Sequence, residues 1–271
     1  MIQILPSIAT SFLYAALGLH FWRTHWHANK QLPTNATWEK WALLIPLSIH
    51  ATLVYQSLFG GNGFNMGVSN AVSTVALLTA LIYWVASFSY KLEGLQALVL
   101  PIAASCVLLP ALFPESHPIP YADLPGFRFH LLISMVAYSL FTIAALHATL
   151  MTLIERRLHH GSLPFMLANM PPLLTMETLL FRIISIGFVL LTLSLGSGML
   201  FSEELFGKPM PFNHKTIFAI ISWGIFAALL GGRKIYGWRG RIAVRWTLSG
   251  FAMLFLAYFG SKFVLQVILH Q

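Results

Sequence analysis

The sequence predicts an all-α integral membrane protein, a single bundle of eight transmembrane helices with both termini on the outer side of the membrane. Hydrophobic residues make up 57% of the 271 residues, charged residues 9%, and the mean hydropathy is +0.74. A soluble domain has about 25% charged residues, so this chain lacks the polar surface that water requires. Eight apolar runs and an uneven distribution of Lys and Arg complete the prediction.

The apolar runs are long enough to cross a bilayer as helices. They cover residues 4–22, 41–59, 67–88, 95–113, 127–154, 179–201, 216–232 and 244–269. The first run is expected to be a retained span, because no Lys or Arg precedes it and no small-residue cleavage pattern follows it. Pro101 and Pro110 interrupt the fourth run. The spans leave no room for a soluble domain, so residues 1–271 are expected to form one polytopic membrane domain.

The orientation follows from the basic residues. The odd-numbered connections, together with Arg182 at the adjoining end of the sixth run, hold 12 Lys and Arg residues. The opposite side holds four, namely Arg128, Lys208, Lys215 and Lys262. Lys and Arg accumulate on the cytoplasmic side of membrane proteins, so the odd connections are predicted to be cytoplasmic.

The fifth run is the longest and carries two histidines. From Phe129 to Ile154 it contains no Asp, Glu, Lys or Arg, a length of ~39 Å as a helix. His130 is expected near the outer surface and His147 well towards the cytoplasmic one. At 3.6 residues per turn the two imidazoles point in different directions and cannot share one ligand.

Several function classes are disfavoured. No Asp or Glu lies within a predicted span, which argues against a proton- or ion-coupled transporter. The sequence shows no paired catalytic groups, so we expect no enzymatic activity. Cys106 is the single cysteine, which excludes an intrachain disulfide and a CxxCH haem attachment site. The basic residues form no clustered face of the kind that binds nucleic acid.

Under the predicted topology three histidines collect at the outer face. His130 opens the fifth span, His214 precedes the seventh, and His270 follows the eighth. A neutral imidazole can ligate haem iron or another transition metal. Interfacial histidines that merely face water and headgroups are the alternative interpretation, and it stays open for each one taken alone.

His50 is a different case, because it lies ~13 Å below the outer end of the second span. An imidazole without a partner in hydrocarbon is costly. We therefore predict that His50 packs inside the bundle against polar groups, with Gln56, Ser69 and Asn70 as candidate partners. If it faced a cavity below His130, it would be a candidate second ligand.

Several stretches together resemble the cytochrome c assembly (CcsA/CcmC/HemX-like) family, and most closely its YpjD-like inner-membrane members. The stretches are FNMGVSNAVS (64–73), FHLLISMVAYSLF (129–141), MPPLLTMETLLFRI (170–183), FNHKTIFAIISW (212–223), YGWRGR (236–241) and LAYFGSKFV (256–264). The core of the resemblance covers residues 64–269. It implies a multi-pass protein of the bacterial inner membrane that handles haem.

The resemblance also implies where haem would be held. In the family, histidines at the outer face hold non-covalent b-type haem; His130 and His270 match two of these positions. His214 lies in FNHKT, where haem-handling members carry the end of a tryptophan-rich loop. We therefore name His130, His214, His270 and His50 as candidate haem-binding residues. The expected partners are the lipid bilayer and other cytochrome c biogenesis or membrane proteins, with no nucleic acid.

The sequence departs from the family pattern in the outer loop. Residues 202–212, SEELFGKPMPF, contain no tryptophan, and Gly231 and Gly232 stand in the region of an intramembrane histidine of the family. A haem-free membrane regulator or partner subunit that keeps the fold is therefore the first alternative. A small-solute or metal transporter is the second, weakened by the absence of acids within the spans.

Overall fold

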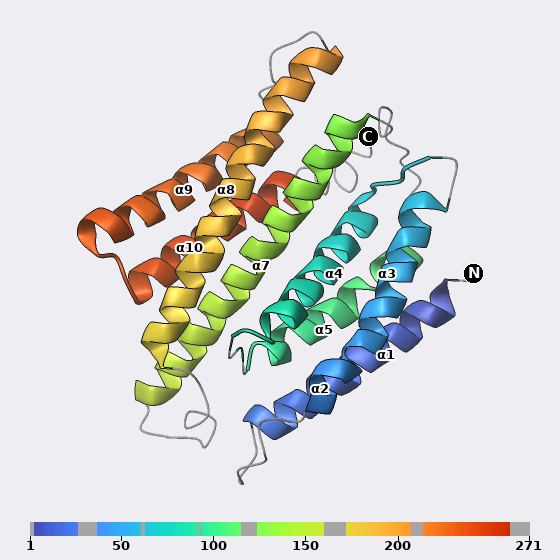
Figure 1. The fold of residues 1–271 in the computed structure, drawn as a ribbon, viewed down its shortest axis with the longest axis horizontal. Coiled ribbons are helices and arrows are strands. Elements are labelled where there is room, and N and C mark those ends of the chain that lie inside the picture. The colour runs from blue at the N-terminus through green and yellow to red at the C-terminus, as the bar shows by residue number, and fades with distance from the viewer. Residues whose placement is uncertain are drawn as a thin grey trace. The chain divides into compact units, whose positions relative to one another are not determined.

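In the computed structural model, the regular structure of the described residues is helical apart from two isolated bridge residues, Gly63 and Asn65. The structure describes residues 3–26, 37–60, 63–90, 92, 94–114, 124–159, 172–206 and 214–260. The elements are α1 (Ile4–Phe21), η1 (Trp22–Trp26), α2 (Thr37–Ala42), α3 (Leu44–Phe59), α4 (Val68–Ala86), α5 (Gln96–Cys106), α6 (Leu109–Leu112), α7 (Pro125–His159), α8 (Leu173–Phe206), α9 (His214–Tyr236), α10 (Arg241–Phe255) and η3 (Leu256–Gly260). Figure 1 shows them coloured along the chain.

Six helical stretches in the described part of the chain are long and apolar enough to cross a membrane. They are Ile4–Thr24, Trp38–Phe59, Val68–Ala86, Pro125–Arg157, Leu173–Leu200 and Lys215–Tyr236. Each overlaps one of the predicted runs, which confirms a helical membrane protein. The eighth predicted run is seen as α10 and η3, and its remaining residues, 261–269, lie outside the described part. The number of eight spans and the placement of the termini stay predictions.

The fourth predicted run is a shorter apolar stretch, Gln96–Leu112, divided into α5 and α6. Pro110 explains the division. A proline within a helix clashes with the carbonyl group four residues earlier, which here belongs to Cys106, and α5 ends at that residue. Pro101 is tolerated inside α5.

The chain divides into two compact units. The first comprises residues 1–120 and 150–175, and the second residues 121–149 and 176–271. In the first unit α1 packs on α3 and α5, and α4 packs on α3 and α5. Gly18 allows the close approach of α1 to α5, because a Cβ there would lie 3.4 Å from the Leu100 Cβ. The expected single domain stays a prediction.

The second unit is built around two stacked aromatic rings. Phe141 of α7 and Phe226 of α9 are fully buried, with ring centroids 4.0 Å apart. Glycines on the flanking helices make room for them: a Cβ on Gly187 of α8 would lie 3.2 Å from the Phe141 ring, and one on Gly250 of α10 would lie 2.7 Å from the Phe226 ring. Small residues of this kind let membrane helices pack closely.

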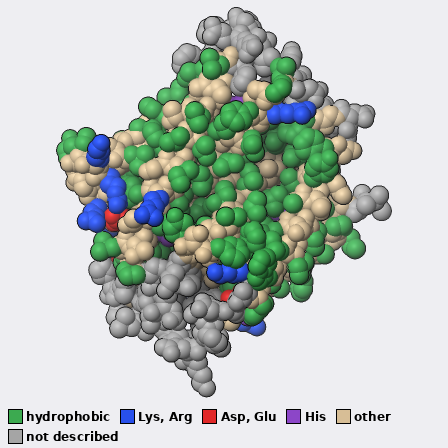
Figure 2. Space-filling view, viewed as in Figure 1, with side chains coloured by type: hydrophobic (Ala, Val, Ile, Leu, Met, Phe, Trp, Pro, Cys, Tyr) green, Lys and Arg blue, Asp and Glu red, His purple; other side chains and the backbone are tan. Residues whose placement is uncertain are grey.

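Large apolar side chains remain exposed along the spanning helices. Leu5 and Phe12 of α1 are 79% and 72% exposed, and Leu200 of α8 is 69% exposed. Figure 2 shows a face dominated by hydrophobic side chains, with Lys and Arg at only a few separate places. Such a surface is suited to acyl chains rather than to water.

Candidate functional site

The structure describes the side chains of two of the four candidate histidines. His130 lies near the start of α7 in the second unit, and His50 lies in α3 in the first. His214 is the first residue of α9, but its side chain lies outside the described part, as does the whole of His270. The convergence of His130, His214 and His270 at one face therefore stays a prediction.

A chain of hydrogen bonds holds the His130 ring against α8. Its Nδ1 lies 2.8 Å from the Ser197 Oγ, and that hydroxyl donates to the Ser194 carbonyl oxygen at 3.1 Å. A serine hydroxyl has one proton, so an Oγ that donates to Ser194 must accept from the His130 Nδ1–H. In the neutral imidazole, Nε2 then carries the lone pair that a metal ion requires.

The backbone around His130 is tied to the same region of α8. The Ser134 hydroxyl lies 2.7 Å from the His130 carbonyl oxygen and 2.6 Å from the Ser194 Oγ. A Cβ on Gly198 would lie 3.3 Å from the His130 Cε1, so α8 packs closely against one edge of the ring. The half-buried imidazole is thus positioned by two serines of α8 and by a close helix contact.

His50 is fully buried, as predicted for an imidazole within the membrane. Its Nε2 lies 3.0 Å from the Ser73 Oγ of α4, and its Nδ1 lies 3.4 Å from the Tyr14 hydroxyl oxygen of α1. Polar packing is therefore confirmed, but through these two groups instead of Gln56, Ser69 and Asn70. Asn70 donates to the carbonyl groups of Ser57 and Asn65. Both His50 nitrogens have partners, so His50 joins three helices.

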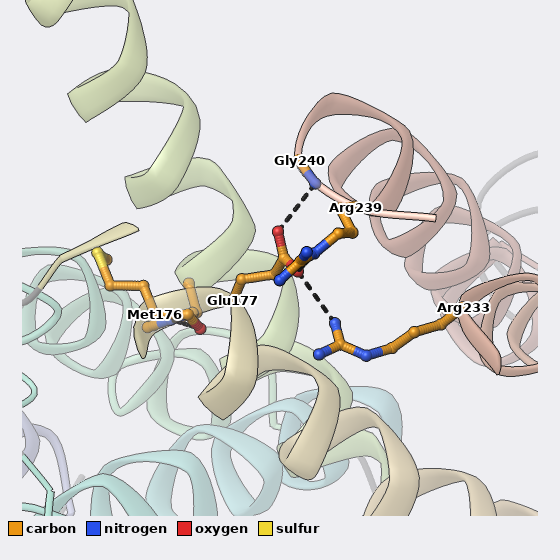
Figure 3. Close-up of polar contacts among 6 residues, drawn as sticks. Met176, Glu177, Arg233, Arg239 and Gly240 are labelled. Carbon is orange, nitrogen blue, oxygen red and sulfur yellow. Dashed lines mark hydrogen bonds and ion pairs between the residues drawn. The ribbon is translucent and has the colours of Figure 1, made fainter. Parts of the chain in front are cut away.

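The structure also shows a polar cluster that sequence reasoning missed. Glu177 lies in the first turns of α8 and is 6% exposed. One carboxylate oxygen, Oε1, accepts from Arg233 Nη1 at 3.1 Å and from Arg239 Nε at 3.2 Å. The other oxygen, Oε2, accepts from the Gly240 backbone N–H at 3.0 Å. Figure 3 shows how the carboxylate lies between the end of α9 and the start of α10.

The neighbouring residue links this cluster to α7. The His147 Nε2 lies 3.0 Å from the Met176 carbonyl oxygen, which can only accept, so Nε2 carries the proton. His147 is 3% exposed, and its Nδ1 has no hydrogen-bond partner among the described residues. The α8 start is therefore bonded on one side to α7 and on the other to the α9–α10 turn.

The sequence did contain signals for the Glu177 cluster. The sixth predicted apolar run begins at 179 and leaves Glu177 in a connection, whereas α8 begins at Leu173. Its three partners lie at the end of one predicted span and before the next, in YGWRGR and its flank. An acid close to the end of a helix, facing several arginines of the same predicted membrane side, is the pattern that would have indicated an ion pair.

Within the described residues, the structure brings no three His, Cys, Asp or Glu side chains together as a metal-binding group. Haem makes a smaller demand, because the macrocycle supplies four ligands to the iron and the protein one or two axial ones. The His130 site supplies one imidazole of the appropriate tautomer, held at Nδ1 as metal-ligating histidines usually are.

Comparisons with known proteins agree with the motif-based resemblance. The profile of the family described as "Cytochrome C assembly protein" matches residues 38–269. The chain is 31% identical over 242 residues to the inner membrane protein YpjD of Escherichia coli strain K12, covering 88% of this chain and 91% of that protein. No solved structure matches the chain.

Shorter matches connect the chain to the cytochrome c biogenesis protein CcsA. It is 38% identical over 89 residues to CcsA of Prochlorococcus marinus strain MIT 9515, covering 33% of this chain and 28% of that protein. It is 35% identical over 86 residues to CcsA of a Synechocystis species, covering 32% and 26%. The predicted family is confirmed: the chain is a multi-pass inner-membrane protein that belongs to the cytochrome c assembly protein family.

Proposed function

We propose that this protein binds haem without covalent attachment and handles it during cytochrome c biogenesis, with His130 as the principal axial ligand. The observation that carries the proposal is the hydrogen-bond chain from the His130 Nδ1 through the Ser197 hydroxyl to the Ser194 carbonyl oxygen. This chain fixes the tautomer and the ring orientation. In this tautomer Nε2 carries the lone pair that would ligate iron, and a hydrogen-bond partner at Nδ1 raises the basicity of a histidine ligand.

His130 would hold haem through its Nε2, and the bound haem would supply a redox-active iron and a visible spectrum that reports its ligation. We propose His214 and His270 as the candidates for a second ligand, because the predicted topology puts both at the outer face with His130. We do not propose ligation by His50, because either of its nitrogens would first have to give up its bond to Tyr14 or Ser73. His50 is better suited to holding α1, α3 and α4 together.

The test is the visible spectrum of the full chain purified in detergent from haem-replete cells, with and without reductant. We expect a low-spin haem spectrum from the wild type and none from His130→Ala. His159→Ala, at the other end of the same helix, is the control and should keep the wild-type haem content. Equal haem content in wild type and His130→Ala would refute the assignment.

A second pair of variants separates ligand positioning from general damage to α8. Ser197→Ala removes the acceptor of the His130 Nδ1–H and should weaken haem retention by about 10- to 100-fold, as the loss of a partner of a metal ligand does. Ser185→Ala removes a hydroxyl that bonds to the Phe181 carbonyl of its own helix, and it should leave haem retention unchanged. The same loss in both variants would contradict the proposed role of Ser197.

The alternative is a haem-free partner subunit that keeps the fold. The absence of tryptophan from residues 202–212 favours it, because the haem-handling members that the chain resembles carry a tryptophan-rich loop there. The same preparations distinguish the two functions. Wild-type protein from haem-replete cells that carries no haem and takes up none on addition would establish the alternative.

We also propose that eight spans place both termini outside, so that the α9–α10 turn is cytoplasmic. The proposal rests on the 12 Lys and Arg residues of one side against four on the other. A reporter that is active only outside the cytoplasm should give a signal when fused after Gln271 and none when inserted at Gly237. The reversed pattern would overturn the orientation.

A further inference from the structure

The α9–α10 turn concentrates positive charge. Residues 233–245 hold five cations and no Asp or Glu, and we call this segment the basic turn: Arg233, Lys234, Arg239, Arg241 and Arg245. Glu177 bonds to two of them, Arg233 and Arg239. Lys234 and Arg245 are exposed on the two helices that flank the turn. Figure 2 shows Lys and Arg gathered with an acidic side chain at the left edge, where Figure 1 draws this turn.

The basic turn has a defined shape. Trp238 folds back so that its ring occupies the place of a Cβ on Gly232, and its backbone N–H donates to the Gly232 carbonyl oxygen at 3.2 Å. The Trp238 ring also contacts the Trp246 ring, with centroids 5.0 Å apart. Gly240 adopts a φ of +56°, which favours glycine, and its N–H is held by Glu177. The backbone that carries the cations is therefore already ordered. For this reason the turn would lose less conformational entropy when a ligand binds.

Apolar side chains stand beside these cations. Ile235 and Tyr236, at the end of α9, are 73% and 74% exposed. A soluble anion such as free phosphate would gain nothing from them. A phospholipid would use both features, because its phosphate meets the cations while its acyl chains cover the apolar side chains.

Glu177 determines which cations are available. Its carboxylate satisfies Arg233, which also lies 3.7 Å from the centre of the Phe181 ring, and it holds the Arg239 Nε. Arg239 nevertheless remains 63% exposed, so it can meet a second anion with its other nitrogens. The Glu177 carboxylate thus holds the α9–α10 turn in place, and the exposed cations of the turn face solvent or lipid.

We propose that the basic turn is a binding site for an anionic phospholipid, whose phosphate group is held by Lys234, Arg239 and Arg245 and whose acyl chains lie against Ile235 and Tyr236. The site lies at the α9–α10 turn and does not involve His130. A negative result for lipid binding would leave the proposed haem function untouched, and a negative result for haem binding would leave the lipid site untouched.

The experiment measures lipid retention on the full chain in detergent by native mass spectrometry, with dioleoylphosphatidylglycerol and dioleoylphosphatidylcholine as probes. We compare the wild type with Lys234→Gln/Arg245→Gln. The matched control is Arg156→Gln/Arg157→Gln, which removes two basic residues of α7 from another connection on the same predicted side. Each cation near a membrane surface contributes roughly a fivefold preference for anionic lipid, so the first double variant should bind phosphatidylglycerol about 25-fold more weakly.

The control should retain phosphatidylglycerol within about twofold of the wild type. Lys234→Arg/Arg245→Lys keeps the charges and should restore binding, which separates lost charge from lost folding. The proposal would be overturned by equal affinity for the two lipids, by an equal loss in the control, or by inorganic phosphate that displaces phosphatidylglycerol at equal concentration. Binding that is unchanged on raising the salt concentration would also overturn it, because exposed charges are screened.

Discussion

Replacing Glu177 with Ala should loosen the α9–α10 turn and lower the stability of the second unit. The change removes the acceptor of three donors, Arg233, Arg239 and the Gly240 N–H. Removing one partner of a fully buried ion pair costs about 3–5 kcal/mol. Here the Arg side chains are 31% and 63% exposed, so water can replace the lost carboxylate at both. With about 1 kcal/mol for each of three lost bonds, we expect a decrease of about 2–3 kcal/mol in the free energy of unfolding.

Two measurements test this prediction. Unfolding in mixed micelles with increasing denaturing detergent gives the free energy, and hydrogen exchange of residues 237–245 reports the turn itself. Glu177→Gln keeps one acceptor oxygen and should lose about half as much stability. Glu39→Gln is the control: Glu39 bonds to the His20 Nε2 at 3.0 Å in the first unit, so its removal should leave exchange in the turn unchanged. Wild-type stability together with wild-type exchange in Glu177→Ala would refute the reasoning.

Two further stability predictions follow from packing and burial. Gly250→Ala places a Cβ 2.7 Å from the Phe226 ring and should lower the free energy of unfolding by about 1–3 kcal/mol. Gly224→Ala is the control, because a Cβ there meets nothing within 4 Å and should not destabilise the protein. Unfolding in mixed micelles measures both variants. His50→Leu leaves the Tyr14 hydroxyl buried without its partner and should cost about 1–3 kcal/mol. The double variant with Tyr14→Phe should then cost less than the sum of the two single changes, and strict additivity would contradict the contact.

Hydropathy predicted the spanning helices well, because length and apolar composition suffice for that decision. It could not predict the division at Cys106, which follows from the local clash of Pro110, or the start of α8 at Leu173, before an acid that hydropathy assigns to a connection. Neutralisation by Arg233 and Arg239 makes that acid acceptable within the helix.

The candidate site was predictable in residue type but not in pairing. Burial of His50 followed from its depth, yet its bonds to Ser73 and Tyr14 depend on how α1, α3 and α4 are rotated about their axes. The same holds for His130, which was named from position and resemblance, whereas its bond to Ser197 joins residues far apart in the sequence. Such contacts are a property of packing, which periodicity alone does not determine.

The polar contacts between α7 and α8 have a mechanical consequence. Hydrogen bonds join these antiparallel helices at two levels. At one level His130 bonds to Ser197 and Ser134 bonds to Ser194, and at the other His147 bonds to the Met176 carbonyl oxygen. The two levels are about 26 Å apart along α7. Sliding one helix past the other along their axes would break the hydrogen bonds at both levels at once. Tilting of the two helices together as a rigid pair would keep these hydrogen bonds, and a ligand bound at His130 would move with the pair.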